Sequence, residues 1–199
     1  MTWFHLLDLG TALLYFLGAL LFLSSIPGAR QSLKLASLWT SAAGFAVHSL
    51  DLGIRMVMDP LFTASQAQFY VSLLAWMFIF LYLLLWWRLR FQFLGLTASS
   101  LALILFCSSL TVSSASLKIP AKLSSLWFSL HIVTLFLSIG FLAMAFGAGL
   151  LYIYADKQIK KKAKIGSFRK NIPALTSFDR VNHWAVSIGF PLFTIGVLS

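Results

Sequence analysis

The chain has 199 residues, of which 60% are hydrophobic and only 10% are charged, and its mean hydropathy is +0.90. Soluble domains average about 45–50% apolar and about 25% charged residues, so this composition excludes a soluble globular protein and indicates an integral membrane protein. Lys and Arg number 15 against five acidic residues, for a net charge of +10. In a membrane protein this excess is read as a signal of orientation and not of nucleic-acid binding.

The first apolar stretch, residues 3–25, is expected to be a permanent membrane helix. The opening MTWFHLLDLG has no Lys or Arg, carries Asp8, and leads into a full-length apolar run without a small-residue cleavage site. A cleaved signal peptide would begin with basic residues and end at such a site. The chain is therefore predicted to start with a spanning helix.

Five further stretches are long enough to cross a bilayer, which takes about 20 apolar residues as a helix. The six predicted spans are 3–25, 35–55, 69–87, 91–110, 124–154 and 182–199. Runs of this length lack the alternation of a barrel strand, so helices are the expected spanning elements. The connectors are short, with turn signals such as Asp59-Pro60. We therefore expect an all-α polytopic membrane helix bundle of about six transmembrane helices, forming one domain over residues 1–199.

Basic residues divide unequally between the two sets of connectors. One set holds three cations, Arg55, Lys118 and Lys122. The other set holds twelve, namely Arg30, Lys34, Arg88, Arg90, Arg180 and the seven within residues 157–170. Cytoplasmic loops are enriched in Lys and Arg. The richer side is therefore predicted to be cytoplasmic, with the N-terminus and the C-terminus outside.

The fifth span and the loop after it carry two further patterns. Gly140, Gly147 and Gly149 predict a thin helix face that allows close helix packing. The basic run KQIKKKAKIGSFRK, residues 157–170, is interpreted as a topology anchor against anionic lipid headgroups. A docking site for an acidic cytoplasmic partner remains the alternative for this run.

Three of the four histidines are predicted to lie in the outer half of the membrane. His131, in the apolar run SLWFSLHIVTLF, is about seven residues below the outer start of the fifth span, or roughly 10 Å deep. His48 reaches a similar depth on the second span, and His5 lies near the outer surface. His183 is placed at the cytoplasmic start of the last span. Ionisable groups in lipid face a partner, a cavity or a ligand, and histidines at matched depth can ligate haem iron.

The residues alone leave the roles of these histidines open. A lone membrane histidine can equally form an interhelical hydrogen bond. Asp51, three residues after His48, can orient its imidazole as a carboxylate partner or be a solvated residue near the helix end. The sequence has no HxxxH or HExxH pair and no glycine-rich phosphate loop, and Cys107 is its single cysteine. Soluble-type catalysis is not indicated.

Two stretches in the last third of the chain go beyond general pattern. LWFSLHIVTLFLSIGFLAMAFGAGLLYIYADKQIKKK (126–162) opens with W-x-x-x-H-[VI], continues with small residues and reaches L-L-Y before a basic loop. IPALTSFDRVNHWAVSIGFPLFTIGVLS (172–199) combines a P-x-L-x-x-x-D-R-x-N linker with a G-F-P-L-x-T-x-G helix. Together they resemble the cytochrome c assembly family, the CcsA/ResC and HemX-like membrane proteins. The matching positions are Trp127, His131, Gly140, Ala145, Leu150, Leu151, Tyr152, Pro173, Leu175, Asp179, Arg180, Asn182, Gly189, Phe190, Pro191, Leu192, Thr194 and Gly196.

The resemblance implies a haem-handling membrane protein of system II-like cytochrome c assembly, which presents haem at the outer side for attachment to apocytochrome c. His131 then corresponds to an axial ligand of transiently bound haem, whereas His48 matches no family ligand position and is only a second candidate. The implied partners are membrane lipid, a CcsB/ResB-type membrane protein and apocytochrome c. The implied location is the bacterial cytoplasmic (inner) membrane. Any enzymatic activity would be at most that of one part of a holocytochrome c synthase complex.

One family feature is missing from these residues. The Trp-rich WWD segment of the family does not occur within residues 1–199. A last span starting near His183 would cover only about 26 Å of a roughly 30 Å hydrocarbon core. The sequence therefore predicts the amino-terminal part of a cytochrome c assembly domain.

Two other functions compete with cytochrome c assembly. The first is a HemX-like, non-enzymatic membrane regulator of an early haem-biosynthesis enzyme, for which the 157–170 loop would matter more than His131. The second, a small-solute transporter, fits less well, because no pair of half-helices broken by Gly or Pro occurs at mid-membrane.

Overall fold

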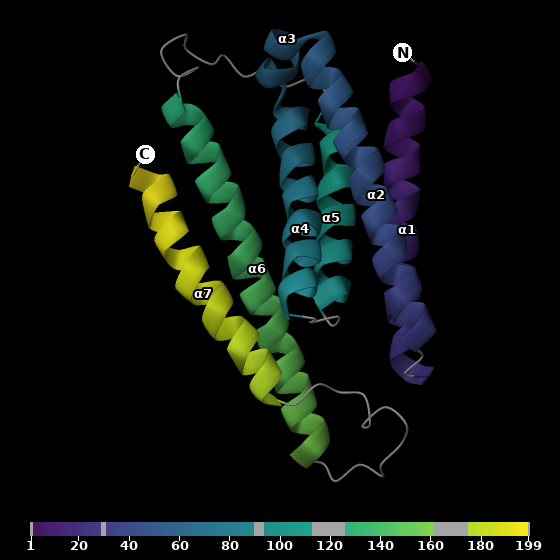
Figure 1. The fold of residues 1–199 in the computed structure, drawn as a ribbon, viewed down its shortest axis with the longest axis vertical. Coiled ribbons are helices and arrows are strands. Elements are labelled where there is room, and N and C mark those ends of the chain that lie inside the picture. The colour runs from purple at the N-terminus through teal and green to yellow at the C-terminus, as the bar shows by residue number, and fades with distance from the viewer. Residues whose placement is uncertain (1, 29–30, 90–93, 113–125, 161–174, 199) are drawn as a thin grey trace.

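The computed structural model describes residues 2–28, 31–89, 94–112, 126–160 and 175–198, and every element within them is a helix (Figure 1). The seven helices are α1 (Thr2–Gly28), α2 (Gln31–Met58), α3 (Pro60–Ser65), α4 (Ala67–Leu89), α5 (Leu94–Thr111), α6 (Leu126–Lys160) and α7 (Leu175–Leu198). The predicted all-α polytopic membrane bundle is confirmed. Helices are the physical solution here because each satisfies its own backbone hydrogen bonds within lipid.

Five of the described helices are long and apolar enough to cross a membrane, namely α1, α4, α5, α6 and α7. The remaining predicted span, residues 35–55, corresponds to α2, which has 28 residues but is interrupted by buried polar residues such as Ser37, His48 and Asp51. Figure 1 shows α2 running alongside α1 over most of its length. Its polar residues therefore face protein neighbours and not lipid.

The helix ends divide between two ends of the bundle. Both chain termini and the short α3 lie at one end (Figure 1). The ends of α1, α4 and α6 and the starts of α2, α5 and α7 lie toward the other end. Among the described cations, Arg55 belongs to the first end, and Lys34, Arg88, Lys157, Lys160 and Arg180 lie close to helix ends at the second. The described cations follow the predicted division, while Arg30, Arg90, Lys118, Lys122 and residues 161–170 lie outside the described residues.

Three predicted boundaries were wrong. The last helix starts at Leu175 and not near residue 182, so its 24 residues span about 36 Å and the argument from a short last helix fails. The fifth span continues to Lys160, where Asp156 and Lys160 form an i,i+4 pair beyond the apolar stretch. Pro60 opens a six-residue helix after Asp59, because proline is well suited to the first turn. Hydropathy marks which residues fit lipid, not where a helix begins.

The core is centred on the α1, α2, α4 and α5 group. Fully buried side chains there include Tyr15, Ile79, Tyr82, Leu94 and Phe106. The α6–α7 pair leans against this group and extends past it at the end away from the termini (Figure 1). A second, smaller cluster joins α4 to that pair through Leu81, Phe141, Ala145 and Ala185.

Glycines set the closest approaches between these two groups. A Cβ at Gly140 would collide with the Leu81 side chain, and one at Gly147 would lie 2.5 Å from Cγ2 of Thr97. Both confirm the predicted thin face of α6, which meets α4 and α5. Gly149 does not belong to that face, since a Cβ there would meet nothing within 4 Å. Gly149 lies two residues from Gly147, which turns it about 200° around the helix.

Candidate functional site

His131 lies near the start of α6, where this helix meets both α4 and α7. One turn earlier, the ring of Phe128 packs edge-on against Tyr70 of α4, with centroids 6.2 Å apart. One turn later, Leu135 is a close neighbour of Gly196 on α7. The His131 side chain is half-buried, and its imidazole has no hydrogen bond to any residue that the structure describes. No described residue therefore competes for its ring nitrogens at this helix junction.

The residues around His131 are apolar or internally satisfied. Trp127, one turn toward the helix start, is 67% exposed. Thr134, one turn further in, hydrogen-bonds the carbonyls of Leu130 and His131 at 2.7 and 3.1 Å. Ser138 continues the same face and is fully buried, with no hydrogen-bond partner for its hydroxyl among the described residues. Sequence reasoning missed Ser138, although its spacing of seven from His131 signals a shared helix face.

His48 has the opposite surroundings. Its Nδ1 lies 3.0 Å from the Tyr15 hydroxyl and its Nε2 lies 2.8 Å from the Ser72 hydroxyl. The ring is completely buried and packs edge-on against Phe106, with centroids 4.8 Å apart. A neutral imidazole can accept from Tyr15 at Nδ1 and donate to Ser72 from Nε2. His48 thus ties α2 to α1 and α4, and neither ring nitrogen is open to a metal.

The two histidines lie at nearly the same depth. Tyr70 and Phe128 are ring neighbours, which sets α4 and α6 level at those residues. Ser72, the partner of His48, is two residues further along α4, or about 3 Å deeper. His131 is three residues further along α6, or about 4.5 Å deeper. The depth relation inferred from the sequence therefore agrees with the packing.

Asp51 does not orient His48. Its two carboxylate oxygens both accept from Nε of Arg55 at 2.9 Å. Nη2 of the same guanidinium donates to both oxygens of Asp8 on α1, at 2.9 and 3.1 Å. Phe4 lies under the guanidinium, 4.8 Å from its central carbon. The alternative of a solvated Asp51 is wrong as well, because Asp51 is only 2% exposed. Arg55 is a stronger partner for the Asp51 carboxylate than the His48 imidazole, because the guanidinium carries a full positive charge.

The two remaining histidines have exposed side chains. His5 lies in the first turn of α1. His183 lies eight residues inside α7, about 12 Å from its start, and not at the helix start as predicted. Within the described parts of the chain, no three His, Cys, Asp or Glu residues gather as a metal site. A haem iron needs only one or two axial protein ligands, so single histidines remain the relevant candidates.

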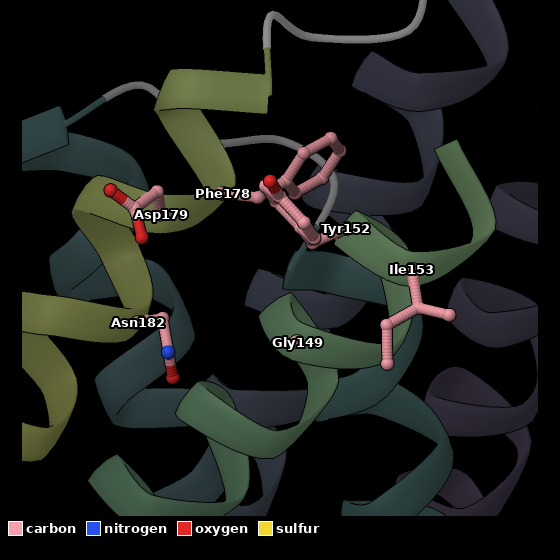
Figure 2. A pocket seen from close by; sticks show the side chains of 6 residues that line it. All are labelled: Gly149, Tyr152, Ile153, Phe178, Asp179 and Asn182. Atoms are coloured by element: carbon pink, nitrogen blue, oxygen red, sulfur yellow. The ribbon is translucent and has the colours of Figure 1, made fainter. Parts of the chain in front are cut away.

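A hollow of about 360 Å³ lies between α6 and α7 at the end away from the termini. Tyr152, Ile153 and Gly149 line it from α6, and Phe178, Asp179 and Asn182 line it from α7 (Figure 2). Tyr152, Asp179 and Asn182 were among the motif positions of the sequence. Only the packing of the two helices shows that these positions, about 30 residues apart in the chain, share one cavity.

Comparison with known protein families decides the broader assignment. The family model described as "Cytochrome C assembly protein" matches residues 64–199. The chain belongs to the cytochrome c assembly protein family. The match covers α4 to α7, more of the chain than the two motifs had indicated, and leaves α1 and α2 outside it. Comparison with curated proteins and with solved structures gave no significant match.

Family membership supports a role in cytochrome c biogenesis for this multi-pass membrane protein. It does not favour the alternative of a regulator of haem biosynthesis. The described residues fit haem at one position, since the His131 imidazole is partly exposed and has no hydrogen bond to them. They do not fit it at His48, where both ring nitrogens are engaged by hydroxyl groups.

Proposed function

We propose that this cytochrome c assembly protein handles haem, with His131 as an axial ligand to the iron on the outer side of the bacterial inner membrane. The observation that carries the proposal is the half-buried His131 imidazole, which makes no hydrogen bond to the described residues. Family membership supports the haem-handling context. An intramembrane ionisable side chain is a functional candidate by default, and no described residue accounts for the His131 imidazole as a hydrogen-bond partner.

The surroundings of His131 support a transient and not a permanent binding site. Thr134 and Leu135 on one side and Phe128 on the other anchor this part of α6 to α7 and α4. The imidazole is therefore carried by a fixed helix, while the exposed Trp127 offers an aromatic surface one turn away. Bound haem would supply the iron and the vinyl groups that become joined to the cysteine thiols of apocytochrome c. The residues of this chain would hold and orient the haem through His131. The exposed Trp127 side of the site stays accessible to other proteins.

The remaining parts of the machinery are proposed to lie outside residues 1–199. No Trp-rich WWD segment occurs within these residues. We propose that a CcsB/ResB-type membrane partner acts with this chain on apocytochrome c, and that the surface holding the porphyrin edge is supplied from outside these residues. The chain would then be one part of a holocytochrome c synthase complex. Orientation with the termini outside would place His131 on the side where apocytochrome c receives haem.

The test is haem binding by His131→Ala, measured in membranes of cells that contain the cytochrome c assembly partners. The protein is affinity-purified in detergent, and its haem is measured by the Soret absorbance per mole of chain. We expect His131→Ala to lose most of this absorbance at normal membrane abundance, because alanine preserves the helix but removes the ligand. Added imidazole should restore part of it by entering the vacated space.

His183→Ala is the matched control, because it removes another histidine from an exposed position on the neighbouring helix. It should keep the haem content and spectrum of the unmodified chain. Unchanged haem in His131→Ala, or equal loss in both variants, would contradict the assignment of His131 as a ligand.

The orientation of the chain in the membrane needs a separate test, because the proposal requires His131 to lie in the outer half of the membrane. Reporters fused after Val112 and after Lys160 should read external and cytoplasmic, respectively, given that Lys and Arg concentrate at the α6–α7 end. The reverse result would place His131 in the inner leaflet and remove this part of the proposal.

A further inference from the structure

The helix α7 buries one face and exposes a polar stripe on the opposite face. The buried face consists of Phe178, Val181, Ala185, Gly189 and Gly196. Gly189 and Gly196 on this face approach α6 closely, at Phe141 and Leu135. At about 100° per residue, the positions opposite this face are 176, 180, 183, 187, 190, 194 and 198. Five of these seven are polar, and all of them are exposed: Thr176, Arg180, His183, Ser187 and Thr194.

Such a stripe is unusual for a helix that faces lipid. Polar side chains in membrane helices usually face the bundle interior or hydrogen-bond across a helix pair. Ser187 lies about 18 Å from the start of α7, in the middle of the span. The hydroxyl of Thr194 bonds the carbonyl of Phe190 at 3.1 Å and can still accept from another helix. α7 is also the least covered of the five spans. Only 22% of the residues in its apolar stretch are buried, against 33–39% in the other four spans.

Two opposite charges near one end of the stripe, Asp179 beside it and Arg180 within it, indicate what covers it. Asp179 lies about 60° to one side of the stripe centre and Arg180 about 40° to the other. Both side chains are exposed, and neither forms an ion pair with another described residue. When two copies of α7 pack in parallel around a two-fold axis, the left flank of one meets the right flank of the other. Asp179 of each copy then faces Arg180 of the other, and the interface is self-complementary.

We propose that a second copy of this chain covers the stripe, so that the protein forms a parallel homodimer through α7. The centre of the interface consists of Thr176, Ser187 and Thr194 from both copies, which act as donors and acceptors at once. Two Asp179–Arg180 pairs close its cytoplasmic-side end. His131 lies on α6, which packs on the other face of α7, so the dimer leaves it accessible.

Disulfide cross-linking in native membranes tests the proposal on the full chain. Cys107 is first replaced by Ser, because it is the single cysteine and is exposed on α5. Ser187→Cys and Thr194→Cys are then introduced one at a time, and oxidation is followed on non-reducing gels. Parallel two-fold pairing brings identical residues together, so both variants should give a band of twice the chain mass. Val186→Cys and Ile195→Cys are matched controls, since both side chains are exposed on the flanks of α7.

A charge swap separates the dimer from other occupants. Asp179→Arg alone and Arg180→Asp alone should each lower the cross-linking yield several-fold, because like charges then face each other. The double variant should restore the yield, since the pair is only reversed. Equal cross-linking at the control positions, no dimer at Ser187 and Thr194, or a cross-link to a chain of different mass would overturn the proposal. Membrane abundance of each variant is measured alongside, so that a misfolded chain is not counted as a monomer.

Discussion

His48 and His131 lie at similar depths in the same bundle, yet their side chains have opposite surroundings. His48 is fully buried among α1, α2, α4 and α5, and hydroxyl groups occupy both its ring nitrogens at 2.8 and 3.0 Å. His131 is half-buried at the meeting point of α4, α6 and α7 and has no such partners among the described residues. A satisfied buried histidine holds helices together, whereas an unsatisfied accessible one is free to bind. Residue type and depth alone do not separate these roles.

The same contrast extends to the two parts of the molecule that carry them. The α1–α2 region pairs polar groups inside the bundle, from the Asp8–Arg55–Asp51 group near the start of α1 to His48 one turn further from that end, and Thr11 is an exception among the described residues. The α6–α7 pair has several accessible polar residues, in the hollow, on the α7 stripe and at His131, besides the buried Thr134 and Ser138. The family match covers the second region and not the first. The matched residues thus include the α6–α7 pair, which differs from the α1–α2 region in its hollow and its exposed polar stripe.

Removing the central cation of the first region should have the largest effect. Arg55→Gln leaves Asp8 and Asp51 close together without a compensating charge, and their side chains are only 13% and 3% exposed. We expect a loss of about 3–5 kcal/mol in unfolding free energy, since breaking a buried pair leaves the remaining charges without a partner. The measurement is the unfolding midpoint of the detergent-purified chain.

Lys160→Gln supplies the matched comparison from the second region. It breaks the ion pair with Asp156, which lies 2.8 Å away on an exposed helix surface. This hydrogen bond raises the pKa of Lys160, but both groups remain in contact with solvent. The unfolding midpoint should not change measurably, because exposed pairs contribute little. Equal losses in the two variants would show that the regions do not differ in this way.

Replacing the two histidines should separate structural from functional roles. His48→Ala leaves the hydroxyls of Tyr15 and Ser72 without their partner and opens a cavity, so we expect a loss of about 2–4 kcal/mol. His131→Ala should cost about 1 kcal/mol or less, because the side chain is only half-buried and has no hydrogen bond to the described residues. Thermal unfolding of both variants, followed by tryptophan fluorescence, checks the difference. A larger loss in His131→Ala than in His48→Ala would reverse the roles.

Two glycines of α6 should differ in how much an added methyl group disturbs the contact between α6 and α5. Gly147→Ala places a methyl group against Thr97 of α5 and should cost about 1–3 kcal/mol through overpacking. Gly149→Ala, two residues later, adds the same methyl group to open space and should cost nothing. Chemical denaturation of the two variants gives the comparison. Equal stability would mean that α6 and α5 can separate without loss.

The smallest expected effect concerns hydroxyl groups within the first region. The Thr11 hydroxyl is fully buried and has no hydrogen-bond partner among the described residues. Thr11→Val keeps the side-chain shape, so its unfolding free energy should stay equal or rise slightly. Ser72→Ala removes the partner of His48 Nε2 and should cost about 1 kcal/mol. A loss in Thr11→Val matching that of Ser72→Ala would reveal a partner for Thr11.

The sequence by itself determined the membrane class, the approximate spans and the division of cations between the ends. These follow from sums along the chain, because lipid requires long apolar runs and orientation depends on charges at their ends. The W-x-x-x-H context of His131 and the motif around Asp179 also predicted the family that the comparison confirmed. The role of His131 as a haem ligand stays a prediction, as does the assignment of the outer side.

Only the tertiary structure decided which polar groups meet. Tyr15 and Ser72 are 33 and 24 residues from His48, and Arg55 joins Asp51 to Asp8 across two helices. Spans such as α1, α4, α5 and α6 are apolar all round, so their periodicity does not show which face is buried. In lipid, small residues and side-chain hydrogen bonds select the contacting faces instead. Those choices depend on pairs of distant residues, as the contrast between Gly147 and Gly149 shows, and no local pattern contains them.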